Sequence, residues 1–209
     1  MIIAIDGPAG AGKGTLAKRI ATHYGLHHLD TGLLYRAVGR DVLAAGRDPA
    51  EPDAATAAAG ALDSATLDDP DLRSEKIGAV ASVVAAIPSV RAALLEFQRD
   101  FARRAPGAVL DGRDIGTVVC PEAEVKLFVT AAVDVRAERR WREMTALGEP
   151  KPLVQVLEEL KVRDERDSRR GTAPLVLVPD AIVIDTSDLD PDAVFAAALA
   201  AIESRIKPR

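Results

Sequence analysis

Several residue types are scarce in this chain of 209 residues, and each shortage excludes a class of protein. A single cysteine, Cys120, allows no disulfide within the chain, which fits a reducing compartment. Aromatic residues reach only 3%, whereas binding of single-stranded nucleic acid relies on aromatic stacking. The longest uncharged run, residues 77–90, contains a proline and is shorter than the ~18 apolar residues of a membrane span. We therefore expect neither a membrane segment nor a nucleic-acid-binding surface.

The rest of the composition is that of a compact domain. Hydrophobic residues make up 48% of the chain, and the formal net charge is -5. A chain of this length and content supports one hydrophobic core, and its negative charge disfavours nucleic acids and membrane surfaces as partners. The opening MIIAID lacks the basic segment and cleavage site of a secretory signal, so we expect a cytoplasmic protein. We also expect a monomer.

Short apolar runs alternate with segments of helical spacing along the chain. The apolar runs predict strands buried on both faces, at residues 1–5, 27–30, 108–111, 125–130 and 181–186. The helical spacing predicts helices at residues 13–24, 33–45, 75–86, 89–103, 133–147, 152–166 and 192–206. This alternation predicts an α/β fold with a five-stranded parallel sheet flanked by helices, in one domain over residues 1–209. Residues 47–73, rich in Ala, Asp and Pro, are expected to form a short helix and loops that stand away from the sheet.

The stretch GPAGAGKGT follows the first expected strand and precedes the first expected helix. Gly7, Gly12 and Lys13 satisfy the G-x-x-x-x-G-K spacing of a phosphate-binding P-loop. Backbone N–H groups of such a loop surround an oxyanion, and the helix adds its positive end. The predicted triphosphate site consists of Gly7, Pro8, Ala9, Gly10, Ala11, Gly12, Lys13, Gly14 and Thr15. Lys13 would reach the β- and γ-phosphates, and the Thr15 hydroxyl is the candidate contact to Mg²⁺.

The sequence contains no asparagine, which disfavours two P-loop and kinase classes. The usual GTPases read guanine with an Asn-Lys-x-Asp segment, and protein kinases hold a metal with a catalytic-loop Asn. Both classes are therefore disfavoured, and the P-loop by itself predicts a nucleotide rather than a reaction.

An anionic acceptor opposite the γ-phosphate needs arginines from several elements. LDTGLLYR places Thr31 and Arg36 just past the second expected strand, although Thr31 would also serve as an N-cap and Arg36 as a solvated helix residue. VLDGRDIGT places Asp111, Arg113 and Asp114 past the third strand, where Asp111 is expected to act on Mg²⁺ through water. Ordinary turn chemistry is the alternative for these three residues.

The richest cluster of charge is KVRDERDSRRGTAPL. Arg163, Arg166 and Arg170 fall on one helical face, with Asp167 within one turn of Arg163 and Arg170. A salt-bridged, exposed helix is the alternative. Because a Gly/Pro hinge follows immediately, we interpret the segment as a lid that closes over bound phosphates.

These segments together resemble the bacterial cytidylate kinases, a family of nucleoside monophosphate kinases. The resemblance covers nearly the whole chain and rests on IDGPAGAGKGT, LDTGLLYR, IPSVRAALLEFQRDF, VLDGRDIGTVV, VKLFVTA, RDERD with RRGTAPL, and IDTSDL. The most specific part is DGRDIGTVV together with RDERD and APL. The best-known members carry a longer, β-rich insertion, for which residues 61–73 are too short.

The resemblance implies a P-loop NTPase fold with a small helical monophosphate-binding subdomain, at about residues 36–105, and a lid, at about residues 150–175. It implies that ATP passes its γ-phosphoryl group to CMP or dCMP in the presence of Mg²⁺, giving ADP and CDP or dCDP. The implied catalytic residues are Lys13, Arg113, Asp114, Arg163, Arg166 and Arg170. The implied acceptor-binding residues are Thr31, Arg36, Arg91, Arg113, Asp114, Asp167 and Arg170.

Two rival functions are left open: a P-loop kinase for another small acceptor, such as UMP or a metabolite, and a non-catalytic ATP-dependent switch. Three further features are expected to be structural. His23, His27 and His28 lack metal-ligand spacing, Cys120 precedes a proline as a small buried residue, and Trp141 lies in an arginine-rich helix.

Overall fold

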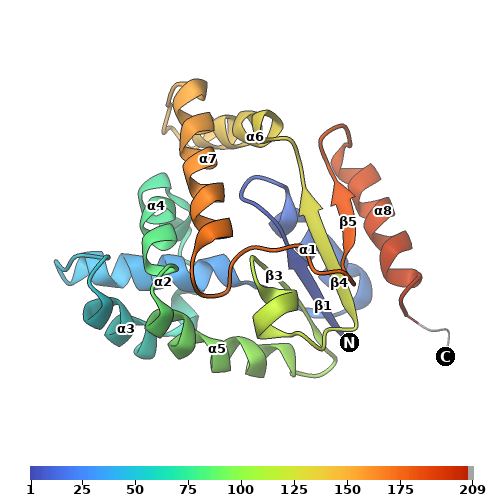
Figure 1. The fold of residues 1–209 in the computed structure, drawn as a ribbon, viewed down its shortest axis with the longest axis horizontal. Coiled ribbons are helices and arrows are strands. Elements are labelled where there is room, and N and C mark those ends of the chain that lie inside the picture. Colours follow the sequence, from blue (N-terminus) through green and yellow to red (C-terminus); the bar gives the residue numbers. More distant parts are fainter. Residues whose placement is uncertain (207–209) are drawn as a thin grey trace. The chain divides into compact units, whose positions relative to one another are not determined.

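The computed structural model describes residues 1–206 and divides the chain into two compact units. The first unit contains Met1–Leu29 and the chain from Phe101 onward, and the second contains Asp30–Asp100. The first unit is built around a sheet whose strands are β1 (Ile2–Asp6), β2 (His27–Asp30), β3 (Ala108–Gly112), β4 (Val125–Thr130) and β5 (Ile182–Asp185) (Figure 1). The second unit is helical.

The sheet has the strand order β2-β3-β1-β4-β5, with β1 at its centre. Parallel pairing aligns Ile5 of β1 with Asp111 of β3 and with Leu127 of β4. Parallel strands end at the same edge of a sheet, so the segments that follow β1, β3, β4 and β5 emerge together. The strand order reverses at β1, which is where open α/β sheets bind their ligands.

One face of the sheet is covered by helices α1 (Lys13–Tyr24) and α8 (Pro191–Glu203) (Figure 1). Ile3 and Ile5 of β1 point to this face with the alternate residues of β4, and they pack against Leu16 and Ile20 of α1. From α8, Val194, Ala198 and Ile202 complete the cluster. Each side chain in it is at least nine-tenths buried, as the uninterrupted apolar runs of the strands predict.

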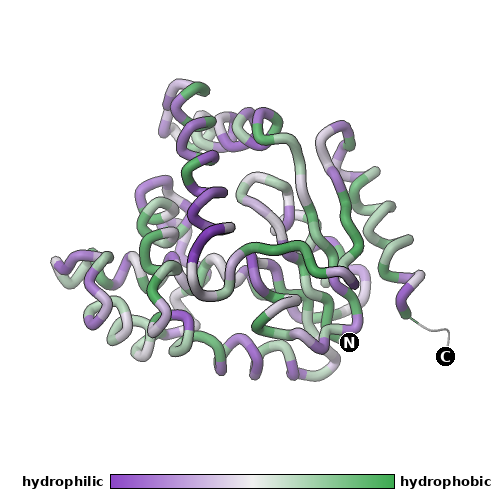
Figure 2. The backbone as a smooth tube through the Cα atoms, in the orientation of Figure 1, coloured by the Kyte–Doolittle hydropathy of each residue, from purple (hydrophilic) through white to green (hydrophobic). Residues whose placement is uncertain are grey.

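Past β3, the chain forms η3 (Ile115–Val119), a single π-helical turn that contacts β1. Beyond β4 come α6 (Val133–Ala146) and α7 (Leu153–Arg169), which pack together through Ala137, Met144, Val156 and Leu160. The second half of α7 is strongly hydrophilic, in contrast to the sheet (Figure 2). Helix α7 therefore has packing partners along its first half and charge along its second.

The second unit contains α2 (Thr31–Ala44), α3 (Pro52–Gly60), α4 (Glu75–Val84) and most of α5 (Pro88–Ala102), with two 3₁₀ turns, η1 (Ser64–Asp68) and η2 (Pro70–Arg73). Helices α2 and α4 approach closely at Gly39, where an added Cβ would lie 2.7 Å from a methyl group of Val80. Arg40 of α2 donates hydrogen bonds to the carboxylate of Asp69 and the hydroxyl of Thr66, which hold the 3₁₀ turns in place.

The five-stranded parallel sheet flanked by helices is confirmed, and every expected strand and helix is present to within a few residues. Residues 47–73 contain α3 and the two 3₁₀ turns, close to the expected short helix with loops. Helix α7 runs three residues further than expected, to Arg169. Within residues 1–206, no single helix meets the length and apolarity required to cross a membrane, although α4 and α5, bent by 102°, meet it as a pair.

Gly7 is required where β1 passes β4. Its φ of 149° disfavours other residues, and a Cβ there would collide with the carbonyl oxygen of Val129. We predict that Gly7→Ala lowers the free energy of unfolding by at least ~3 kcal/mol, because β1 and β4 must separate to admit the methyl group. Urea denaturation followed by circular dichroism measures this change.

Gly148→Ala is the matched control. Gly148 also has a positive φ, of 77°, but within residues 1–206 no atom beyond the glycine and its two chain neighbours lies within 4 Å of the position of its Cβ. Only backbone strain of about 1 kcal/mol is expected there. Equal losses in the two variants would show that the contact with Val129 is unimportant.

Candidate active site

The P-loop joins β1 to α1 and presents the helix N-terminus without any side chain to satisfy it. The N-cap, Gly12, has a φ of 87°, makes no side-chain cap, and is followed by a first turn that contains no acidic residue. The first N–H groups of a helix need an acceptor and carry partial positive charge. The sequence thus leaves an anion-binding site at this end of α1.

Lys13 lies across this loop in a buried position. Its side chain is only slightly exposed, and Nζ donates a 2.7 Å hydrogen bond to the carbonyl oxygen of Pro8. A buried ammonium group at the mouth of an anion site adds a full positive charge to the helix dipole. Phosphate oxygens entering the loop are stronger acceptors for Nζ than a neutral carbonyl.

Asp6 connects the end of β1 to the turn after β3. Its two carboxylate oxygens each accept a 2.8 Å hydrogen bond, from the backbone N–H groups of Ile115 and Gly116. Those bonds fix the start of η3, directly after Asp114. The pKa of Asp6 is raised from 3.8 to about 6. Burial is the largest cause and the nearby charge of Asp114 acts in the same direction, while the two N–H groups and Lys13 lower the pKa.

The predicted magnesium residues lie beside the first turn of α1. Asp111, at the end of β3, is buried, and its Oδ2 lies 2.8 Å from Nε2 of His28 on β2. Its Oδ1 lies 4.0 Å from the position that a Cβ of Gly14 would take. Thr15 is exposed. Among residues 1–206 there is no group of three or more His, Cys, Asp or Glu side chains that could hold a metal by themselves.

A cavity of about 380 Å³ opens next to the P-loop, of a size suited to the nucleoside part of a nucleotide. Its walls come from the loop, from α1 and α6, and from the segment between β5 and α8. The lining residues are Gly10, Ala11, Gly12, Thr15, Leu16, Arg19, Arg139, Arg140, Glu143, Thr186, Leu189, Pro191 and Val194. The P-loop therefore has an adjoining pocket on the side of α8.

A second cluster joins the turn after β3 to the end of α7. Nε of Arg113 donates a 2.9 Å hydrogen bond to Oδ2 of Asp167, and Nη2 of Arg170 lies 3.6 Å from Oδ1 of Asp114. The side chains of Arg170, Asp114 and Asp167 are all nearly buried. Buried charges of this kind are stable only in pairs, so each carboxylate keeps one arginine in place.

The cluster changes the protonation of its central acid. Burial alone would raise the pKa of Asp167, but the guanidinium groups of Arg113, Arg163 and Arg170 outweigh that effect and hold the pKa below 3.8. Asp167 is therefore ionised at neutral pH. An ionised carboxylate can only accept hydrogen bonds, here from Arg113.

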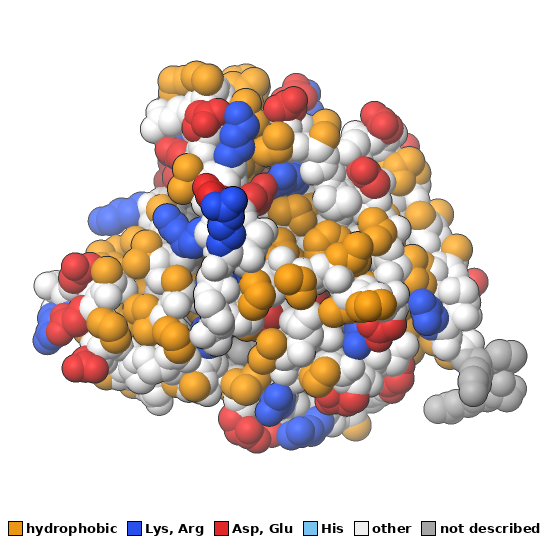
Figure 3. Space-filling model, in the orientation of Figure 1, with side chains coloured by type: hydrophobic (Ala, Val, Ile, Leu, Met, Phe, Trp, Pro, Cys, Tyr) orange, Lys and Arg blue, Asp and Glu red, His pale blue; other side chains and the backbone are white. Residues whose placement is uncertain are grey.

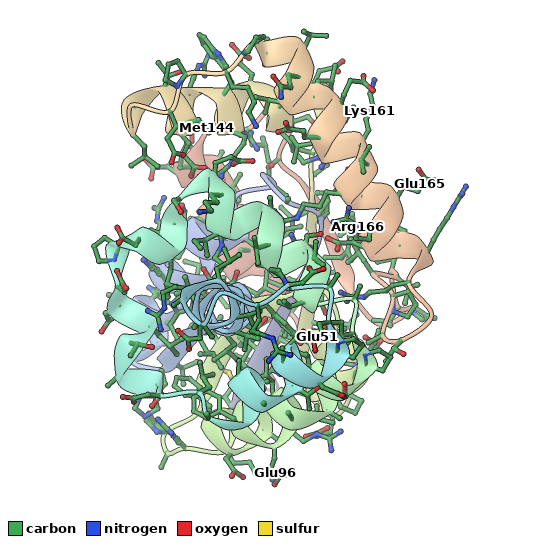
Figure 4. The ribbon with its side chains drawn as sticks, turned by 90° about the vertical axis from the view of Figure 1, so that its left-hand side faces the viewer. Glu51, Glu96, Met144, Lys161, Glu165 and Arg166 are labelled. Atoms are coloured by element: carbon green, nitrogen blue, oxygen red, sulfur yellow. The ribbon has the colours of Figure 1, made fainter. Side chains whose placement is uncertain are left out.

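The arginines of α7 differ in their surroundings although their spacing is regular. Arg163 is half-buried, Arg166 is exposed, and Arg170 directly follows the helix as its C-cap. Figure 4 shows Glu165 and Arg166 on different sides of α7. The exposed Arg169–Glu165 pair fits the alternative of a salt-bridged surface helix, but the buried Arg170 does not. On the surface, blue and red side chains gather over α7 (Figure 3).

In the second unit, three predicted acceptor residues are buried or half-buried. Thr31 is the first residue of α2, and the N-cap is Asp30, which accepts from the N–H of Gly32, so the alternative of Thr31 as N-cap is wrong. Nη1 of Arg36 donates to the carbonyl oxygens of Leu72 and Ser74, which excludes a solvated side chain.

Arg91 of α5 is likewise held by contacts within the second unit. It is buried, donates a 3.2 Å hydrogen bond to the carbonyl oxygen of Ala85, and lies over the ring of Tyr35 at 5.3 Å. A buried arginine over an aromatic ring has a fixed guanidinium plane, which suits recognition of an anion.

The comparisons with known proteins agree with this geometry. A profile of the cytidylate kinases matches residues 3–204. Over 205 residues the chain is 60% identical to a cytidylate kinase of Xanthobacter autotrophicus, covering 98% of both chains. It is also 60% identical to a cytidylate kinase of Azorhizobium caulinodans, covering 97% of this chain and 98% of that relative. The chain belongs to the cytidylate kinase family.

Two solved structures resemble this chain in fold alone. An uncharacterized protein from Eubacterium ventriosum has a TM-score of 0.55 at 20% identity and covers 98% of this chain and 99% of its own. A protein from Thermus thermophilus has a TM-score of 0.51 at 20% identity and covers 100% and 98%.

Sequence reasoning passed over several residues that the structure places at this cytidylate kinase site. Arg139 of α6 donates to the hydroxyl and carbonyl oxygens of Thr186, and the Thr186 hydroxyl lies 3.3 Å from the carbonyl oxygen of Ala11 in the P-loop. The only signal in the sequence was the density of arginines in the helix expected at residues 133–147. Asp6 gave no signal beyond its position at the end of a strand.

The three remaining features have structural contacts. Nε2 of His27 pairs with the carbonyl oxygen of Ala105, and His23 packs edge-on against Phe195. Cys120 is buried, as expected. Trp141 packs against the cluster between α6 and α7.

The raised pKa of Asp6 makes stability depend on pH. Between about pH 4 and pH 6 the folded chain holds a proton that the unfolded chain has released. The contribution of Asp6 is therefore largest at acid pH and is lost as the pH rises through about 6. We predict that the free energy of unfolding, wild type minus Asp6→Asn, falls by about 2–3 kcal/mol from pH 4 to pH 7.

Urea denaturation of both proteins at several pH values measures this difference. Because asparagine does not titrate, groups common to both proteins cancel in the subtraction. A difference that stays constant from pH 4 to pH 7 would contradict the raised pKa.

Proposed function

We propose that this chain transfers the γ-phosphoryl group of ATP to CMP or dCMP, giving ADP and CDP or dCDP. The observation that carries the proposal is the uncapped N-terminus of α1 behind a P-loop with a buried Lys13, in a member of the cytidylate kinase family. The near full-length identity of 60% to proteins named cytidylate kinase supports the acceptor.

The donor is proposed to bind with its phosphates in Gly7–Thr15. Lys13 exchanges the carbonyl oxygen of Pro8 for the β- and γ-phosphate oxygens. The nucleoside takes the adjoining cavity of about 380 Å³, between α1, α6 and the segment before α8. Backbone N–H groups hold the phosphates in place without reorganisation during the reaction.

The site is suited to magnesium held mainly by the nucleotide. Mg²⁺ is usually bound through one or two carboxylates together with substrate phosphates, and Asp111 is a buried carboxylate beside the first turn of α1. Asp111 and Thr15 are the residues that would hold it. When bound, the ion neutralises phosphate charge and aligns the donor.

The residues proposed to bind the acceptor are Thr31, Arg36, Arg91, Arg113, Asp114, Asp167 and Arg170. Asp167 and Thr31 are assigned to the base and sugar, and Arg36 and Arg113 to the phosphate. Arg170 is assigned a position between the two nucleotides.

The chemistry needs no nucleophile from the protein, because the attacking phosphate oxygen of the acceptor is already ionised. Phosphoryl transfer passes through a loose transition state, so catalysis consists of alignment and stabilisation of charge. Lys13, Arg113, Arg163, Arg166 and Arg170 supply the positive charge. The ion pairs Arg113–Asp167 and Arg170–Asp114 join the turn after β3 to the lid, residues 150–175, and keep both arginine side chains oriented before substrate arrives.

We further propose a monomer that acts on free nucleotides in the cytoplasm rather than on nucleic acid. The formal net charge of -5 and the aromatic content of 3% support free nucleotides as the substrates.

Loss of either of two cationic side chains should greatly slow turnover without unfolding the protein. We predict that Lys13→Met and Arg170→Ala each lower kcat by about 100-fold or more, because each removes positive charge from the transferring group. The assay couples ADP formation to NADH oxidation with CMP as acceptor. Circular dichroism establishes that each variant is folded.

Arg169→Ala is the control for Arg170→Ala. Arg169 is the neighbouring arginine, its side chain is 79% exposed, and it pairs with Glu165 on the surface. Turnover of that variant should stay within about twofold of wild type, because exposed pairs contribute little. Near wild-type turnover in Lys13→Met or Arg170→Ala would contradict the assigned roles.

Measuring kcat/KM with CMP, dCMP, UMP and AMP in the same assay identifies the preferred acceptor. We predict kcat/KM for CMP and dCMP at least ~10-fold above that for UMP and AMP, because buried charged groups that pair with one base are left unpaired by another. A preference for UMP would favour the rival kinase. Absence of turnover with all four, despite ATP binding, would favour the non-catalytic switch.

A further inference from the structure

Arg136, on α6, bonds to three separate segments of the first unit. Nε donates to the carbonyl oxygen of Ala131 at 2.9 Å, Nη1 to that of Ala9 in the P-loop at 3.1 Å, and Nη2 to Oδ2 of Asp164 on α7 at 2.7 Å. The side chain is 7% exposed. A guanidinium group can serve three acceptors in fixed directions, which an ammonium group cannot.

The P-loop lies directly against α6 at this residue. A Cβ on Gly10 would lie 3.1 Å from both Cβ and the carbonyl oxygen of Arg136, so the absence of a side chain permits the approach. Ala9 also packs against the apolar cluster between α6 and α7, as does Trp141. The loop and the two helices are therefore in contact through side chains as well as through the arginine.

The bond to Ala9 determines the direction of a backbone N–H group. In a planar trans peptide the C=O and N–H bonds point in opposite directions. Because the carbonyl oxygen of Ala9 points at Arg136, the N–H of Gly10 points away from α6. A rotation of this peptide on phosphate binding would lengthen the bond to Arg136.

The bond to Asp164 extends the link to the lid. Asp164 lies one residue from Arg163 and three from Asp167, which is held by Arg113. Its Oδ1 is buried and, within residues 1–206, has no hydrogen-bond partner. Because Oδ2 of Asp164 is the oxygen that accepts from Arg136, a movement of Arg136 would act on α7 through this ion pair.

We infer that Arg136 is a positioning residue that couples occupation of the P-loop to the lid helix α7. It orients the Ala9–Gly10 peptide at one end and Asp164 at the other, so binding of donor phosphates changes the packing of α7. This inference rests on the proposed function, since it takes ATP as the ligand of the loop.

Three variants separate the two ends of the link. Arg136→Lys and Arg136→Met remove the three-way contact, and Asp164→Asn removes the charge on α7 while both carbonyl bonds of Arg136 stay. Arg142→Lys is the matched control on the same helix, because its side chain is 66% exposed and pairs with Glu138. Trp141, the only tryptophan, reports the packing of α6 against α7 through its fluorescence.

Binding of ATP with MgCl₂ is measured by calorimetry and by Trp141 emission, and kcat and KM for ATP are measured with CMP. Arg136→Lys and Arg136→Met should raise Kd for ATP about 10-fold and abolish the emission change. Asp164→Asn should leave Kd within about twofold yet reduce the emission change and lower kcat about 10-fold. Combining Arg136→Lys with Asp164→Asn should lower kcat by less than the product of the single effects. Arg142→Lys should match wild type.

The inference is overturned if Arg136→Lys keeps wild-type Kd and emission change, if Asp164→Asn weakens ATP binding as much as Arg136→Lys, or if ATP leaves wild-type emission unchanged. If the Arg136 variants do not fold, Asp164→Asn alone decides through its split between Kd and kcat. Wild type that binds ATP but forms no ADP with CMP would contradict the proposed function, while the binding and emission measurements would still decide the coupling.

Discussion

An anion-binding loop must offer its N–H groups to the ligand while its own carbonyl oxygens are satisfied elsewhere. In this chain three such carbonyls have donors from side chains: Pro8 from Lys13, Ala9 from Arg136 and Ala11 from Thr186. Buried carbonyl oxygens without donors would cost free energy and let the peptides rotate. The loop therefore depends on α6 and on the end of β5, which explains why those elements surround it.

The same part of the chain concentrates buried charge. Lys13, Asp6, Asp111, Asp114, Arg136 and Asp167 are all buried in the first unit. The pKa values of Asp6 and Asp167 move in opposite directions. Burial raises both, but the N–H groups and Lys13 beside Asp6 do not offset it, whereas the charges of three guanidinium groups outweigh it at Asp167. Burying charges lowers stability unless they are paired, so the stability of the fold does not account for this arrangement, and such clusters are typical of functional sites.

Local patterns were enough to predict most of the fold and the P-loop. The G-x-x-x-x-G-K spacing and the apolar runs are properties of neighbouring residues, and the structure places them as expected. The links between elements could not be predicted, because Asp6 with Gly116 and Arg136 with Ala9 are each more than 100 residues apart. Even within a single turn the sequence did not determine which residue caps the helix. Asp30 is the N-cap of α2, and Thr31 is buried.

Arginine shows why residue type and spacing do not assign a role. Arg169 and Arg170 are neighbours at the end of α7, yet one side chain is 79% exposed and the other 6%. Arg136 and Arg142 share α6, but the first bonds to three segments and the second pairs with Glu138 on the surface. Burial and the identity of the acceptors distinguish the members of each pair. Because a buried guanidinium group is fixed by all its partners at once, a change at any one of them is felt at the others, whereas an exposed arginine relaxes into water.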